Sequence, residues 1–134
     1  MKFYQVIKLE KKLSEQLSEL NERFINNNCI SINELRDYEP DVILDIIKKT
    51  SDELIRIRFI IDRFNLNIRE LTLKNEEYNN IINLLKSTPT SMSKDSVNSF
   101  TRVELDNIIK EYQNKINSNN ETIDYYKFTT DIEI

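Results

Sequence analysis

Apolar side chains recur at spacings of three and four residues along most of the chain, with charged and polar residues between them. This period is that of an amphipathic α-helix. We predict helices over residues 3–25, 40–71, 73–86 and 102–126, with a mobile linker over residues 87–99. Short connections favour antiparallel neighbours, so the predicted fold is a single all-α domain, residues 1–134, in which long antiparallel helices form a helical bundle or coiled coil.

The predicted helix over residues 40–71 has apolar residues on two faces. Its first stripe alternates spacings of four and three and consists of Ile43, Ile47, Thr50, Leu54, Ile57, Ile61, Phe64, Ile68 and Leu71. Its second stripe is offset from the first and consists of Ile55, Phe59, Leu66 and Leu73. A helix with two apolar faces needs two packing partners, and the second is either another segment of the chain or another copy of it.

Local residues mark the predicted helix ends. Asn26 to Asn28 are expected to end the first helix, because asparagine tolerates the left-handed conformation found there. The segments 31–34 and 101–104 both have the form of a capping box, Ser or Thr followed three residues later by Glu. Pro40 suits the first turn of a helix, where its missing N–H is not needed. Thr72 is expected to interrupt or cap a helix before Leu73.

Asn119 is a polar residue on the apolar stripe of the last predicted helix. A polar residue in such a stripe can select the register or the oligomeric state, at some cost in stability. The alternative interpretation is a frayed position that faces water. The stripe alone does not choose between them.

The residues that are missing exclude several kinds of chemistry. The chain has no glycine and only two prolines, so a β-rich fold and a glycine-rich nucleotide loop are both disfavoured. It has no histidine, which excludes a Ser-His-Asp triad and a histidine-based zinc site within one chain. The net charge of -4 argues against a protein that neutralises nucleic-acid phosphates. We therefore predict no enzymatic activity, no cofactor and no nucleic-acid partner.

Clusters of carboxylates are the remaining candidates for a metal site or for acid–base catalysis. They are Asp52 with Glu53, Glu76 with Glu77, and Asp131 with Glu133. Carboxylate oxygens suit magnesium, and carboxylates also occur on solvated helix faces and near helix N-termini. We interpret these clusters as solvated and predict no metal site.

Cellular location is inferred from the cysteine content and the N-terminus. Cys29 is the only cysteine, which excludes an intrachain disulfide and favours a reducing compartment. Lys8, Glu10, Lys11 and Lys12 interrupt the first apolar residues before a signal core develops. No run of apolar residues approaches the length of a membrane span. We expect a cytoplasmic protein without a membrane partner.

Three segments together resemble the small bacterial septicolysin-like family. They are IKLEKKLSEQLSELNERF, ELIRIRFIIDRFNLNIRELTLKNEEYNNIINLLK and LDNIIKEYQNKINSNNETIDYYKFTTDIEI. The resemblance implies an oligomeric helical protein. The family name implies a pore-forming cytolysin.

Two hypotheses follow for the function. The first is a structural or interaction protein that forms homo-oligomers, with Ile55, Phe59, Leu66 and Leu73 at the interface between copies or facing a protein partner. The alternative is a membrane-active, cytolysin-like protein, based on the family name and on the apolar helix faces.

Overall fold

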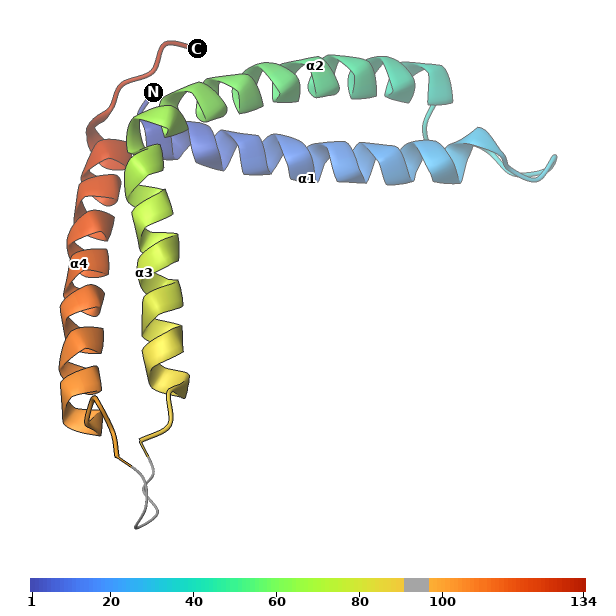
Figure 1. Cartoon of the computed structure of the whole chain (residues 1–134). Helices are drawn as coiled ribbons and strands as arrows, with labels where there is room; N and C mark the ends of the chain where they lie inside the picture. Colours follow the sequence, from blue (N-terminus) through green and yellow to red (C-terminus); the bar gives the residue numbers. More distant parts are fainter. Residues whose placement is uncertain (91–96) are drawn as a thin grey trace. The chain divides into compact units, whose positions relative to one another are not determined.

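The chain is all-α, as predicted. The computed structural model describes residues 1–90 and 97–134. Within them lie four α-helices, α1 (Phe3–Asn28), α2 (Pro40–Asn65), α3 (Arg69–Ser87) and α4 (Arg102–Thr129), and one 3₁₀ turn, η1 (Leu66–Ile68) (Figure 1). The only β pairing of the described residues is an isolated bridge between Lys2 and Asp131. The arrangement of the helices as a bundle stays a prediction.

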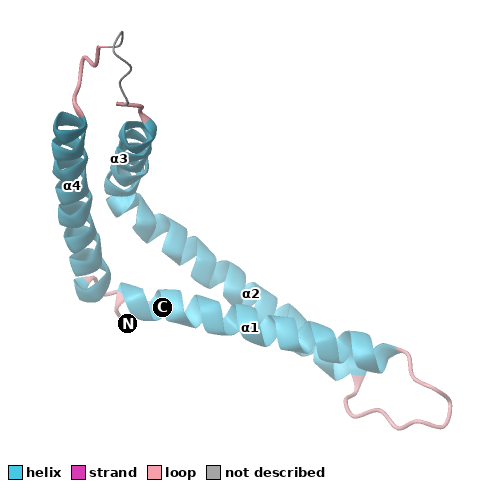
Figure 2. Ribbon diagram, turned by 90° about the horizontal axis from the view of Figure 1, so that it is seen from below, coloured by secondary structure: helices cyan, strands magenta, loops and turns pink. Residues whose placement is uncertain are grey.

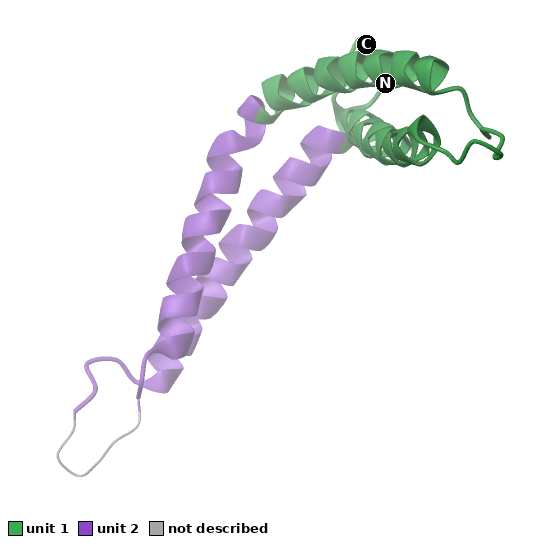
Figure 3. Cartoon of the chain, turned by 90° about the vertical axis from the view of Figure 1, so that its right-hand side faces the viewer, with its two compact units in different colours: residues 1–65, 128–134 green, residues 66–127 purple. Residues whose placement is uncertain are grey.

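The described residues group into two compact units. Unit 1 contains residues 1–65 and 128–134, and unit 2 contains residues 66–127 (Figure 3). The sequence predicted a single domain over residues 1–134. Each of the two units has its own pair of helices.

Unit 1 is built on α1 and α2, which lie side by side and run in opposite directions (Figures 1 and 2). Its buried apolar side chains are Phe3, Val6, Ile43, Leu54, Ile57 and Ile132. Three of them, Ile43, Leu54 and Ile57, belong to the first stripe of α2. Phe64, also on this stripe, lies against Phe3 with 6.1 Å between the ring centroids. The first stripe therefore packs within the chain, as predicted.

The two ends of the chain meet in unit 1. The Phe3 N–H donates to the Thr130 carbonyl at 3.0 Å, and the Ile132 N–H donates to the Met1 carbonyl at 2.8 Å. Lys2 and Asp131 form an ion pair at 2.8 Å, and the hydrogen bond from Lys2 lowers the pKa of the Asp131 carboxyl. The closing segment is therefore part of the core of unit 1, through Ile132.

Unit 2 is built on α3 and α4, which lie side by side and run in opposite directions (Figures 1 and 3). Its buried apolar side chains are Ile68, Ile82, Leu105, Ile116 and Ile123. Tyr78 of α3 and Tyr112 of α4 lie with 5.2 Å between their ring centroids. The Lys115 ammonium lies 4.7 Å from the Tyr112 centroid, so a cation–π contact borders the aromatic pair.

The prediction of one helix over residues 40–71 was wrong, as was the break at Thr72. Helix α2 ends at Asn65, the 3₁₀ turn η1 follows, and α3 begins at Arg69. Asparagine is a weak helix former, and Asn67 donates from Nδ2 to the Tyr126 hydroxyl at 2.7 Å. Thr72 lies inside α3, where its hydroxyl donates to the Arg69 carbonyl at 2.9 Å. The spacing of apolar residues continues through η1, where Ile68 is buried. This spacing therefore did not reveal that α2 ends at Asn65.

Cationic side chains bind the carbonyls at three helix C-termini. The chain has no glycine, and none of the described residues has a positive φ. Helix α1 extends to Asn28 and ends at an extended Cys29, so the predicted left-handed end at Asn26 to Asn28 was wrong. Arg36 donates instead to the Asn27 carbonyl at 2.9 Å and to the Asn28 carbonyl at 3.5 Å.

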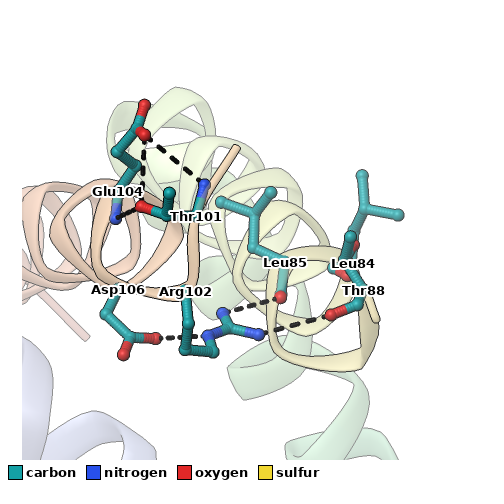
Figure 4. A network of polar contacts seen from close by, with 7 residues as sticks. All are labelled: Leu84, Leu85, Thr88, Thr101, Arg102, Glu104 and Asp106. Atoms are coloured by element: carbon teal, nitrogen blue, oxygen red, sulfur yellow. Dashed lines mark hydrogen bonds and ion pairs between the residues drawn. The ribbon is translucent and has the colours of Figure 1, made fainter. Parts of the chain in front are cut away.

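Helices α3 and α4 end in the same way as α1. Arg102 donates to the carbonyls of Leu85, at 3.0 Å, and Thr88, at 3.3 Å (Figure 4). Lys2 donates to the Thr129 carbonyl at 3.4 Å. Since the C-terminus of a helix carries partial negative charge, a cation there both satisfies carbonyls and interacts favourably with the helix dipole. Arginine and lysine side chains thus take the place of the usual glycine cap.

Helix α4 begins with the predicted capping box. The Glu104 N–H donates to the Thr101 hydroxyl at 3.2 Å, and the Thr101 N–H donates to the Glu104 carboxylate at 3.4 Å (Figure 4). Pro40 is the first residue of α2, also as predicted. Residues 31–34 form only a turn, in which the Glu34 N–H donates to the Ser31 carbonyl at 3.0 Å, so the short helix considered there does not form.

The predicted linker over residues 87–99 is only partly covered by the structure. Ser87 belongs to α3, and residues 91–96 lie outside the described residues. On either side of them, Asn98 donates from Nδ2 to the Thr90 carbonyl at 3.1 Å. The mobility of this linker stays a prediction.

Replacing Arg102 with methionine should destabilise unit 2. The substitution keeps the apolar stem but removes the bonds to Leu85 and Thr88, and the ion pair with Asp106 at 3.0 Å. We expect the free energy of unfolding to fall by about 1–2 kcal/mol, the range for losing hydrogen bonds from a charged group. Arg69→Met, at an exposed position of α3, is the matched control. Urea unfolding followed by circular dichroism compares them, and equal effects would contradict the capping role.

Candidate self-association surface

The side of α2 opposite its first stripe carries two large exposed apolar side chains. We define the outer face of α2 as Lys48, Ser51, Asp52, Ile55, Arg58, Phe59 and Asp62, which share this side by helical spacing. Ile55 is 66% exposed and Phe59 is 70% exposed. They lie one helical turn apart and so form one apolar patch. Leu44, also exposed, lies on the same side toward the start of α2.

Two of the four predicted interface residues lie on a different helical segment. Leu66 belongs to η1 and Leu73 to α3, both in unit 2, whereas Ile55 and Phe59 belong to α2 in unit 1. All four are exposed. The four residues were predicted to form a second stripe beside the first stripe of α2; because α2 ends at Asn65, only Ile55 and Phe59 belong to that helix. The candidate surface is therefore reduced to the outer face of α2.

Charged residues of both signs surround the apolar patch. Arg58 forms an ion pair with Glu10 of α1 at 3.0 Å. Lys48, Asp52 and Asp62 are exposed and take part in no ion pair within the described part of the chain. This surface therefore combines an apolar centre with charges that have no partner in those residues.

The neighbouring residues Glu53 and Arg56 are paired with each other. The Arg56 guanidinium donates to both Glu53 carboxylate oxygens, at 2.6 and 3.2 Å. This hydrogen bonding lowers the pKa of Glu53 and raises the pKa of Arg56. Glu53, one of the carboxylates considered for metal binding, is thus occupied by an arginine.

A second exposed apolar group lies in the loop between α1 and α2. Ile32 is 99% exposed and Leu35 is 94% exposed. Asn27 connects this loop to the end of α1: its Nδ2 donates to the Arg23 carbonyl at 2.8 Å, and its Oδ1 accepts from the Asp37 N–H at 3.2 Å. Sequence reasoning missed this group, because it searched for apolar residues at helical spacing.

Three asparagines join α3 to α4 in unit 2. The Asn119 side chain donates to Asn75 at 3.0 Å, and the Asn75 side chain donates to Asn120 at 3.0 Å. Asn119 was interpreted either as a residue that sets the pairing of helices or as a frayed position that faces water. The structure shows it in a contact between two helices. A polar contact of this kind disfavours shifted pairings of the two helices, because a shift would leave the amides unpaired.

The acidic side chains and Cys29 are the remaining candidates for chemistry among the described residues. No group of three or more histidine, cysteine, aspartate or glutamate side chains among them is arranged to hold a metal ion. Asp131 is paired with Lys2, and Cys29 is an exposed thiol. Within residues 1–90 and 97–134, no helix has the length and apolar character needed to cross a membrane.

Comparisons with known proteins add no function. The chain matched no protein-family model, no curated protein and no solved structure. The resemblance to the septicolysin-like family stays a prediction.

Proposed function

We propose that this chain is a non-enzymatic helical protein that self-associates through the outer face of α2. One observation carries the proposal: Ile55 and Phe59 are exposed on a helix whose opposite side is already buried in unit 1. Covering apolar surface stabilises an association by about 25 cal/mol per Å². Another copy of the chain is the simplest partner, because it is present wherever the chain itself is present and at the chain's own concentration.

The composition of the surface suits an interface with an apolar centre and a polar rim. A stable interface buries about 800 Å² per partner, more than two side chains supply. The charged residues around Ile55 and Phe59 would provide the rest, as rim contacts that exclude water from the centre. Aromatic side chains often dominate the binding energy at such centres, which makes Phe59 the expected anchor.

The test is the mass of the chain in solution over a wide range of concentration. Light scattering is measured with a reductant present, because Cys29 is exposed and would otherwise form disulfides between copies. We expect the mass to rise with concentration to a defined multimer. A mass that stays at 16.0 kDa at all concentrations would contradict self-association.

The second candidate function is a membrane-active, cytolysin-like protein, and the loop between α1 and α2 favours it. Ile32 and Leu35 are almost fully exposed there, as expected of residues that enter a lipid surface. Glu34 and Asp37 lie beside them and would be repelled by anionic lipids. Dye release from neutral and anionic vesicles tests this function. Leakage that is lost in an Ile32→Ser/Leu35→Ser variant would support it, and no leakage from either vesicle would oppose it.

A further inference from the structure

We propose that the second copy packs antiparallel along α2, with the two-fold axis passing at Ile55. This inference rests on the proposed function and specifies its partner and geometry. In such a dimer both copies use the same surface, and each contact occurs twice unless it lies on the axis. Residues equally far before and after position 55 then lie at the same level of the interface, and those near the middle of the outer face meet.

This arrangement brings the outer face of α2 onto itself. Ile55 meets Ile55 of the second copy on the axis, and Phe59 faces Ser51 of the second copy. Ser51 has a small side chain and is only half-buried, so it leaves room for the aromatic ring. Ile55 lies one turn from Ser51, so the ring also reaches Ile55 of the second copy.

The charges on this face become complementary in the same arrangement. Lys48 and Asp62 both lie near the middle of the outer face, so Lys48 faces Asp62 of the second copy, once on each side of the axis. Lys48, Asp52 and Asp62 are the exposed charges without an ion-pair partner in the described part of the chain.

Other arrangements of the two helices bring like charges together. An antiparallel pairing centred at position 57 places Phe59 opposite Ile55 of the second copy. It also places Asp52 opposite Asp62 of the second copy, once on each side of the axis. A parallel two-fold pairing places each charged residue opposite its own copy. Since juxtaposed like charges cost several kcal/mol at an interface, the charge pattern selects the antiparallel pairing centred at Ile55.

Disulfide formation between two copies tests the position of the axis. Ile55→Cys is made in a Cys29→Ser background, with Ser51→Cys in the same background as the matched control. On the axis, two thiols at position 55 lie within reach of a disulfide. Thiols at position 51 are about 12 Å apart along the helix at about 1.5 Å per residue, beyond the reach of about 7 Å between Cα atoms. We expect a covalent dimer on oxidation of the first variant only.

Charge reversal provides a second test. Lys48→Glu and Asp62→Lys should each weaken self-association about tenfold, and the double variant should recover it. Lys49→Glu is the matched control, because it makes the same charge change at an exposed position beside the outer face.

The outcomes separate this inference from the proposed function. Disulfides at both positions, or no recovery in the double variant, while the wild-type chain remains a multimer, would overturn the antiparallel arrangement and leave self-association intact. A wild-type chain that stays a monomer would overturn both.

Discussion

Replacing Ile57 with alanine is expected to lower the free energy of unfolding of the chain by about 2–5 kcal/mol. Ile57 is 0% exposed and belongs to the first stripe of α2, so the truncation leaves a cavity in the core of unit 1. The matched control is Ile55→Ala, the same substitution two residues away at an exposed position. We expect the control to change the free energy by less than about 0.5 kcal/mol, as is usual at exposed sites.

Urea unfolding followed by circular dichroism measures both Ile variants, at a dilution where the chain is a monomer. The dilution is essential because Ile55 is expected to contribute to association and not to the stability of the monomer. Equal destabilisation by the two substitutions would show that Ile55 is also covered in the monomer. Both stripes of α2 would then be core, and the proposed association surface would be lost.

A second large effect is expected at the end of the chain. Ile132→Ala should lower the free energy of unfolding by about 2–4 kcal/mol, because this side chain is only 3% exposed. Ile134→Ala is the matched control, since Ile134 is 47% exposed and should change stability little. The same unfolding measurement compares them. No difference between the two variants would show that residues 130–134 do not belong to the core of unit 1.

The helical period was sufficient to predict most of the helical segments and their buried sides. Ile57 and Leu54 are buried where the first stripe predicted, because burial of one face decides which residues lie inside. Local rules also predicted the helix starts at Pro40 and after Thr101. These features depend on residues that are close together in the sequence.

The missed features depend on residues far apart in the sequence. Helix α2 ends before Leu66, and Asn67 finds its partner in Tyr126. The C-terminus of α3 is capped by Arg102, which lies at the start of α4. The segment between these helices has no helical spacing of apolar residues from which this contact could be predicted. Ile132 is buried because the chain ends meet, and no stripe contains it.

Two of the four residues predicted for the interface lie on the candidate surface. Ile55 and Phe59 are exposed on α2, and they are the residues on which the proposal depends. Leu66 and Leu73 were included because the apolar spacing continues past Asn65, but they lie on η1 and α3. The 3₁₀ turn η1 interrupts the α-helical spacing after Asn65, and the spacing of apolar residues did not predict it.

The most direct test of the account is the mass of the wild-type chain and of a Phe59→Glu variant, measured side by side by light scattering. Leu84→Glu, which places the same charge at an exposed leucine of α3, is the control. We expect a multimer for the wild-type chain and for the control, and a monomer of unchanged helicity for Phe59→Glu. A Phe59→Glu variant with the same multimeric mass as the wild-type chain would contradict association through the outer face of α2.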